Sequence, residues 1–133
     1  WKVGIQNPRQ PGPLATLALR DGEAIGTSGD YQRFFEVDGQ RYCHLIDPRT
    51  GQPVTHTQAL TVLIPPQEKV GTYSDAMTKP IFIAGEHWRE TARQLGVANV
   101  LRVDAAGHIL LTRPMRERLE FVADPPPAME IVP

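Results

Sequence analysis

The stretch QRFFEVDGQRYCHLI, residues 32–46, decides the expected fold, because two β-prone runs flank an Asp-Gly dipeptide. Asp-Gly is one of the residue pairs that fit the two positive φ angles of a tight hairpin turn. Phe34, Phe35, Tyr42 and Leu45 supply the apolar surface by which such runs pack. The stretch therefore predicts an antiparallel hairpin.

Other β-prone segments lie on both sides of this hairpin. Most alternate apolar with polar or small residues, and the Asp21-Gly22 pair signals a second hairpin. The apolar run 59–64 ends at two prolines and fits a more buried strand. The predicted strands are residues 1–5, 14–20, 24–27, 59–64, 99–103, 108–111 and an edge strand over 115–122.

Helical spacing replaces alternation after Pro65-Pro66, with Ala76, Ile83 and Ala84 recurring at multiples of a turn. Ser74 or Thr72 is expected to cap a first helix, and Pro80 is expected to kink or interrupt it. A second helix is predicted over 86–95, with Gly96 just past its end. Short antiparallel strands and hairpins with two helices packed on them define an α+β fold.

Composition describes one small folded domain. The 133 residues include 14 Lys+Arg and 15 Asp+Glu, a net charge of −1, which argues against a strongly basic nucleic-acid binder. Hydrophobic residues make up 41% and charged residues 22%, the usual globular mix. The single cysteine, Cys43, excludes an intramolecular disulfide, and no apolar run reaches bilayer length.

The ends of the chain carry two further expectations. Because the sequence begins at Trp1, directly in a strand pattern, we expect a piece of a longer protein. We expect one structured segment over 1–123 and a proline-rich tail over 124–133 that leaves the core. Strands left without partners favour a homo-oligomer or a swapped dimer.

Three polar clusters follow apolar runs, at positions where loops carry function. They are residues 27–31 (TSGDY), 44–51 (HLIDPRTG) and 74–79 (SDAMTK). The first cluster offers hydroxyls, a glycine and a carboxylate that can present backbone N–H groups to a phosphate. The alternative is an ordinary turn with side-chain capping.

The second cluster combines a base, a carboxylate and a guanidinium within six residues. His44 can act as a general base near neutral pH, Asp47 can orient it or bind a hydroxyl, and Arg49 can bind phosphate. The alternative is an Asp-Pro turn in which Asp47 bonds its own backbone and Arg49 is solvated.

The third cluster places two oxygen-bearing side chains one helical turn apart. Asp75 and Thr78 then share a helix face and can hold a hard cation. The alternative is an aspartate favoured near a helix start by the helix dipole.

These clusters, in this order, resemble the C-terminal half of the FAD:protein FMN transferases, the ApbE-like flavin transferases. WKVGIQNP looks like the family's tryptophan-initiated strand, and TSGDYQRFFEVDGQRYCHLIDPRTGQPV resembles its longest motif almost throughout. SDAMTKPIFIAG looks like the segment that supplies magnesium ligands. The resemblance runs from residue 1 to about residue 111.

The resemblance implies transfer of FMN from FAD to a Ser or Thr hydroxyl of an acceptor protein, with release of AMP and with Mg²⁺ on the pyrophosphate. It implies that His44 deprotonates the acceptor hydroxyl, that the backbone around Leu45 lies against FAD, and that Asp75 binds the metal. The remaining expected cofactor-binding residues are Ser28, Gly29, Tyr31, Asp47, Arg49 and Lys79. The family implies a bacterial periplasm or cell-envelope location, with any membrane anchor outside this segment.

The sequence departs from the family at one ligand position. Lys79 stands where the family usually has a metal-binding threonine, and a protonated lysine has no acceptor for Mg²⁺. Thr78 is a substitute ligand, or Lys79 neutralises the pyrophosphate directly. The alternatives are a flavin-binding domain without activity and a structural or interaction module without flavin. The family's preceding half, which supplies a further metal ligand and much of the FAD pocket, is not in this sequence.

Overall fold

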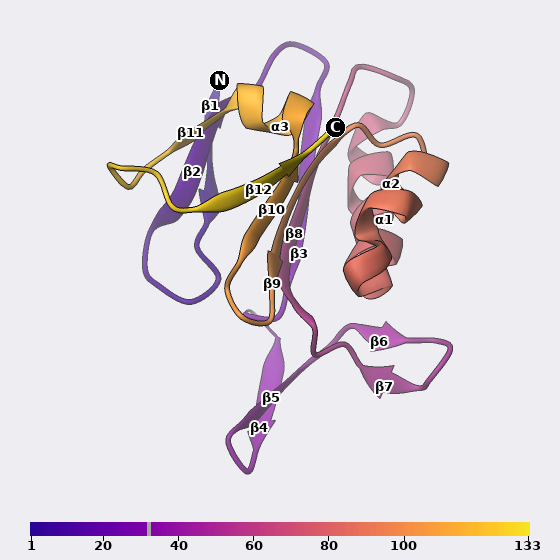
Figure 1. Cartoon of the computed structure of the whole chain (residues 1–133). Helices are drawn as coiled ribbons and strands as arrows, with labels where there is room; N and C mark the ends of the chain where they lie inside the picture. The colour runs from indigo at the N-terminus through magenta and orange to yellow at the C-terminus, as the bar shows by residue number, and fades with distance from the viewer. Residues whose placement is uncertain (32) are drawn as a thin grey trace.

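The computed structural model describes residues 1–31 and 33–133, so Gln32, at the start of the predicted run 32–37, lies outside the described residues. A five-stranded sheet organises the chain in the order β12-β10-β9-β8-β3 (Figure 1). Only the β10–β12 pair is parallel among these neighbours. Its strands are β3 (Ala24–Gly29), β8 (Thr57–Ile64), β9 (Asn99–Asp104), β10 (Ile109–Thr112) and β12 (Met129–Val132).

Every residue of β8 is buried, which confirms the buried strand expected over 59–64. A run that is apolar on both faces needs cover on both sides, because each face of a sheet must be removed from water. Two layers provide that cover, one of strands and one of helices.

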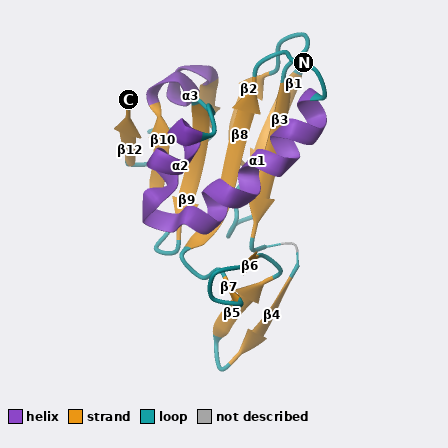
Figure 2. Cartoon of the chain, turned by 90° about the vertical axis from the view of Figure 1, so that its right-hand side faces the viewer, coloured by secondary structure: helices purple, strands orange, loops and turns teal. Residues whose placement is uncertain are grey.

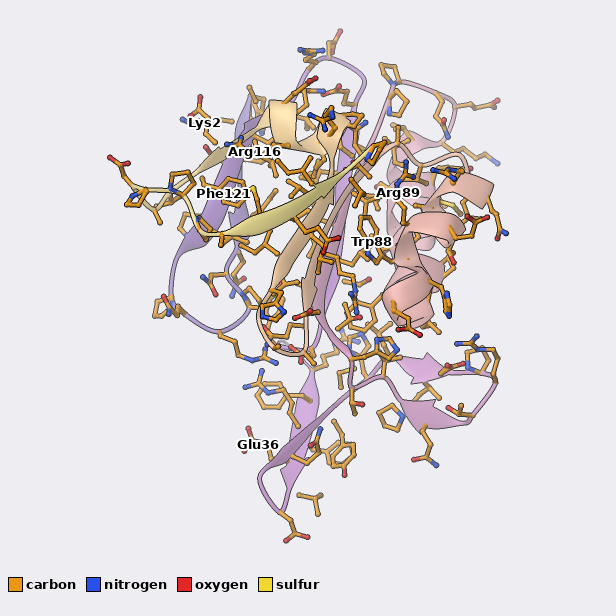
Figure 3. All side chains as sticks on the ribbon, in the orientation of Figure 1. Lys2, Glu36, Trp88, Arg89, Arg116 and Phe121 are labelled. Atoms are coloured by element: carbon orange, nitrogen blue, oxygen red, sulfur yellow. The ribbon has the colours of Figure 1, made fainter. Side chains whose placement is uncertain are left out.

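The strand layer is a three-stranded sheet in the order β1-β2-β11. It comprises β1 (Lys2–Gln6), β2 (Pro13–Ala18) and β11 (Leu119–Phe121). Ile5 and Leu17 point from it into a core shared with Leu63 and Leu101 of the larger sheet. At its outer edge the Arg116 guanidinium lies 5.4 Å from the centre of the Phe121 ring (Figure 3).

The helix layer consists of α1 (Val70–Ala84), a short 3-10 turn η1 (Gly85–His87) and α2 (Trp88–Gln94). Both α-helices lie on one face of the five-stranded sheet (Figure 2). Phe82 and Trp88 bury their rings against Val62 and Val100 there. The α+β prediction, with two helices packed on a mainly antiparallel sheet, is confirmed.

The start of α1 differs from the prediction. The helix begins at Val70, after Lys69 in the left-handed conformation (φ 55°), and no side chain caps it. Ser74 instead donates its hydroxyl to the Gly71 carbonyl inside the helix. Pro80 does not interrupt α1: it lies on the exposed face, where the Ala76 carbonyl that loses its partner can be hydrated.

Two small hairpins extend from one end of the sheets (Figure 1). The first pairs β4 (Phe34–Val37) with β5 (Gln40–Cys43), and Asp38 and Gly39 at its turn have φ of 51° and 78°, which confirms the predicted hairpin. The second pairs β6 (Ile46–Asp47) with β7 (Gln52–Pro53).

The hairpin expected around Asp21-Gly22 is wrong. Gly22 does turn the chain with φ of 80°, but β2 pairs with β1 and β11 whereas β3 pairs with β8. Turn residues specify the local reversal, while burial decides which sheet each arm joins.

The C-terminal part corrects two further expectations. Residues 115–122 do not form one edge strand, because α3 (Arg113–Arg118) precedes β11, and Pro114 stands in the first turn where proline suits a helix. The tail does not leave the core as expected, because β12 pairs in parallel with β10. The end of α2 agrees with prediction: Gly96 has φ of 73° and donates to the Arg93 carbonyl. In the described part of the chain, no helix is long and apolar enough to span a bilayer.

Candidate functional site

The first and third polar clusters meet inside the protein. Ser28, on β3, places its hydroxyl 2.7 Å from the Thr78 hydroxyl on α1, and both side chains are buried. Thr78 donates its own proton to the Asp75 carbonyl at 2.8 Å, so Ser28 is the donor to Thr78. This hydrogen-bonded pair fixes α1 against β3, and Lys79 directly follows Thr78 in the helix.

Gly26 allows α1 to approach β3 this closely. A Cβ at Gly26 would lie 2.6 Å from the Ser74 carbonyl oxygen, closer than real contacts permit. Sequence reasoning missed this residue, although a glycine inside a strand pattern is the signal for a close backbone approach.

Gly29 and Tyr31 also lie together. A Cβ at Gly29 would be 2.1 Å from the Tyr31 ring, so glycine leaves the space into which the ring folds back. The ring packs beside the core between the two sheets, and burial raises the pKa of its phenol. In this arrangement the phenol serves packing, while its expected flavin contact stays a prediction.

Asp30, the carboxylate of the first cluster, is a polar hub whose arginine partners the sequence did not predict. Its two carboxylate oxygens each accept a 2.7 Å hydrogen bond from Arg9, in the loop after β1. Arg41, from β5, lies 3.8 Å from the same carboxylate. Asp30 therefore ties the β4–β5 hairpin to the body of the protein. Hydrogen bonding to Asp30 also raises the pKa of Arg9.

The second cluster forms an Asp-Pro turn, which is the alternative to a catalytic or phosphate-binding cluster. Asp47 Oδ1 accepts hydrogen bonds from the Arg49 backbone N–H at 2.9 Å and from Arg49 Nε at 3.1 Å, and Oδ2 accepts from Nη2 at 2.9 Å. These bonds from Arg49 hold the pKa of Asp47 below its usual value. The Arg49 side chain is 71% exposed, so its outer edge is open to a ligand.

His44 stands apart from Asp47. Its ring is exposed, with Nδ1 3.3 Å from the Arg33 carbonyl, and its backbone N–H donates to that same carbonyl. Asp47 does not orient His44 as one interpretation expected, because the Asp47 oxygens hold Arg49. The side chain of Leu45 is buried in the core, and its carbonyl accepts from Val54 N–H.

A surface cleft brings the second and third clusters together. It has a volume of about 400 Å³ and lies between the β6–β7 turn and α1. Asp47 and Arg49 line one side, and Lys79 lines the other. A neighbouring cleft of about 580 Å³ shares Asp47 and Arg49 and extends to His56.

His56 and Arg102 line this second cleft and meet at the buried Thr57 hydroxyl, in a network that sequence reasoning missed. The Thr57 hydroxyl donates to the Phe82 carbonyl near the end of α1 at 3.2 Å. It therefore accepts from His56 Nδ1 at 2.8 Å and from Arg102 Nη2 at 3.3 Å. Burial and the Arg102 charge lower the pKa of His56. Placing a guanidinium near the carbonyl end of α1 also suits the helix dipole.

The predicted magnesium ligands do not fit a divalent ion in this arrangement. The Thr78 oxygen is fully buried and already bonded to Ser28 and to the Asp75 carbonyl. Asp75 Oδ1 is 3.2 Å from Lys79 Nζ, a cation where a metal would bind. Within residues 1–31 and 33–133, His, Cys, Asp and Glu side chains form no group of three that could hold a metal.

Comparisons with known proteins point to one family. The model of the ApbE family matches residues 1–101. A FAD:protein FMN transferase of Rhodobacter capsulatus is 42% identical over 123 residues, covering 92% of this chain and 23% of the relative. The enzyme of the same name from Escherichia coli K12 is 33% identical over 100 residues, covering 74% of this chain and 28% of that enzyme.

Solved structures give the same picture. The ApbE protein of Thermotoga maritima superposes with a TM-score of 0.75 at 33% identity, covering 89% of this chain and 38% of that one. The flavinyl transferase ApbE of Pseudomonas stutzeri superposes with a TM-score of 0.66 at 30% identity, covering 92% of this chain and 37% of that one. The chain spans about a quarter of the length of the curated relatives. The chain belongs to the ApbE family.

Proposed function

We propose that this chain is part of a FAD:protein FMN transferase, which moves FMN from FAD to a Ser or Thr hydroxyl of an acceptor protein and releases AMP. The observation that carries the proposal is the cleft whose lining includes Arg49, Lys79 and Asp47, in a chain whose relatives bear that enzyme name. The resemblance also favours the bacterial periplasm or cell envelope as the place of the reaction.

The proposed reaction requires little covalent chemistry from the protein. The acceptor oxygen forms a bond to the phosphorus on the FMN side of the pyrophosphate, and the bond from that phosphorus to the bridging oxygen breaks. AMP leaves with the bridging oxygen, and the hydroxyl proton passes to His44. Positioning and charge neutralisation are the main requirements of such phosphoryl transfers. Arg49 and Lys79 supply positive charge, and the exposed His44 ring is accessible to a protein acceptor.

One observation favours a second candidate, a flavin-binding domain without catalysis. Lys79 pairs with Asp75, and the Thr78 hydroxyl is bonded to Ser28 and to the Asp75 carbonyl, so both expected Mg²⁺ ligands are engaged within the protein. Because the donor set does not fit the metal, no step of the proposed reaction is assigned to it. FAD binding without AMP release would favour this second candidate.

The test uses the longer parent protein together with its acceptor and FAD. We expect the acceptor to gain the mass of FMN while one AMP is released per FMN transferred, measured by intact-protein mass spectrometry and by nucleotide chromatography. AMP release without acceptor labelling would indicate hydrolysis instead of transfer. Saturable FAD binding with neither product would support the second candidate.

A further inference from the structure

Lys79 occupies a defined position on α1. Its ammonium lies 3.2 Å from Asp75 Oδ1 and 3.3 Å from the Asp75 backbone carbonyl, one helical turn earlier. Both side chains remain partly exposed, at 46% for Lys79 and 78% for Asp75. An exposed ion pair of this kind adds little stability, so the ammonium can exchange partners at low cost.

The neighbouring oxygens cannot recruit a divalent ion to this part of the helix. Thr78 Oγ1 lies in the interior, where it accepts from Ser28 and donates to the Asp75 carbonyl. A protonated lysine offers three donors and no lone pair, so Lys79 repels a metal that approaches Asp75. Lys79 thus supplies positive charge from the protein itself, which Asp75 balances until a ligand replaces it.

The cleft beside Lys79 offers two cations to a phosphate group, although Pro48, Pro80, Ile83 and Ala84 make much of its lining apolar. Its second cation, Arg49, comes from the β6–β7 turn, and Asp47 holds that side chain through the Nε and Nη2 atoms. The guanidinium's remaining N–H bonds are available to a ligand, because only part of its donor fork is used by Asp47. A volume of about 400 Å³ accommodates a pyrophosphate.

We propose that the Lys79 ammonium, together with Arg49, holds the pyrophosphate of FAD in the role that a divalent ion would otherwise fill, so that flavin binding by this protein needs no metal. Asp75 is then a positioning residue, because it holds the Lys79 ammonium until phosphate replaces it. The inference rests on the proposed function, since FAD is the ligand that function names.

The first test measures FAD binding by the longer parent protein through flavin fluorescence, in EDTA and in Mg²⁺. The wild-type affinity is expected to be the same in both. Lys79→Met keeps the length of the side chain and removes its charge, and should weaken binding by about tenfold. Lys2→Met is the matched control, because Lys2 forms a surface ion pair with Glu120 within the three-stranded sheet, away from the cleft. It should leave the affinity unchanged.

A second test follows metal binding without flavin. Mn²⁺ broadens the NMR signals of amides close to its binding site, so it reports contact with Asp75 directly. Asp21 and Asp38 are exposed turn aspartates that serve as internal references. The proposal predicts no more broadening at Asp75 and Thr78 than at those two residues. Selective broadening at Asp75 that Asp75→Asn removes would overturn it.

The outcomes separate this inference from the proposed function. FAD affinity that rises with Mg²⁺, and loses that rise in Asp75→Asn, overturns the metal-free site while the transferase stands. A parent protein that binds no FAD in either condition also overturns the inference. The transfer assay on the parent protein then decides the proposed function by itself.

Discussion

The hydroxyl of Ser28 lies 2.7 Å from the hydroxyl of Thr78, although fifty residues separate them in the chain. This contact sets the depth of α1 on β3. The side chain that follows Thr78 is Lys79, which faces the cleft. A buried hydrogen bond between two clusters therefore determines where the candidate phosphate-binding charge stands.

Removing either partner of this hydrogen bond should destabilise the fold. Thr78→Val leaves the Ser28 hydroxyl buried without a partner and should cost about 2 kcal/mol. Ser28→Ala should cost about 1 kcal/mol. The double variant should lose less than the sum by about 1 kcal/mol, because the two side chains interact directly. Urea unfolding of the four proteins measures this coupling, and strict additivity would contradict the contact.

Gly26→Ala tests the close approach of α1 to β3. A new Cβ 2.6 Å from the Ser74 carbonyl must push helix and strand apart, at an expected cost of about 2 kcal/mol in the free energy of unfolding. Gly71→Ala is the control, because it lies in α1 with no atom within 4 Å of the added carbon. That variant should be neutral or slightly stabilising, by up to about 1 kcal/mol. Equal effects of the two changes would argue against steric contact.

The ion pair between Glu23 and Arg118 predicts that the folded protein loses stability in acid. Arg118 binds both carboxylate oxygens, at 2.7 and 2.8 Å, and lowers the pKa of Glu23 from its ordinary 4.5 to about 2. A depressed folded-state pKa contributes stability above pH 4.5, and this contribution is lost as the pH falls from 4.5 toward 2. The contribution is on the order of 2–3 kcal/mol.

Urea unfolding at a series of pH values should show this loss in the wild type. Glu23→Gln should be less stable than the wild type at pH 7, with a difference that shrinks as the pH falls toward 2. A difference that stays constant across that range would show that the ion pair does not shift the titration.

Asp30→Asn should loosen the β4–β5 hairpin. The neutral amide cannot accept both 2.7 Å bonds from Arg9 or attract Arg41, and the expected loss of stability is about 1–3 kcal/mol. Amide hydrogen exchange in the β4–β5 hairpin should accelerate in the same variant. Asp38→Asn makes the same chemical change at the hairpin turn, where asparagine tolerates the φ of 51°, and should have little effect. Faster hairpin exchange in the control alone would contradict the anchoring role of Asp30.

Local chemistry predicted the parts of the fold that depend on neighbours in sequence. The Asp38-Gly39 turn and the Gly96 helix end needed only positive φ angles. Asp21-Gly22 has the same turn chemistry, yet its flanking strands join different sheets, because partner choice depends on distant strands. The strand β12 likewise exists only because β10 offers it an edge.

The candidate site also combines features that the local sequence reveals with features that depend on distant residues. The clusters that contain Asp47, Arg49 and Lys79 were visible as motifs, and the structure brings these three residues to one cleft. The burial of Thr78 under Ser28 was not visible, because it requires the spacing of helix and strand that Gly26 permits. No local pattern reports that spacing.

The most direct measurement compares flavin transfer and FAD binding in the longer parent protein carrying His44→Ala. If His44 takes the acceptor proton, the transfer rate should fall by about 100-fold or more while FAD affinity stays within about twofold. His108→Ala, an exposed histidine in the β9–β10 turn, is the matched control and should transfer FMN at the wild-type rate. Transfer by His44→Ala at the rate of this control would contradict the account.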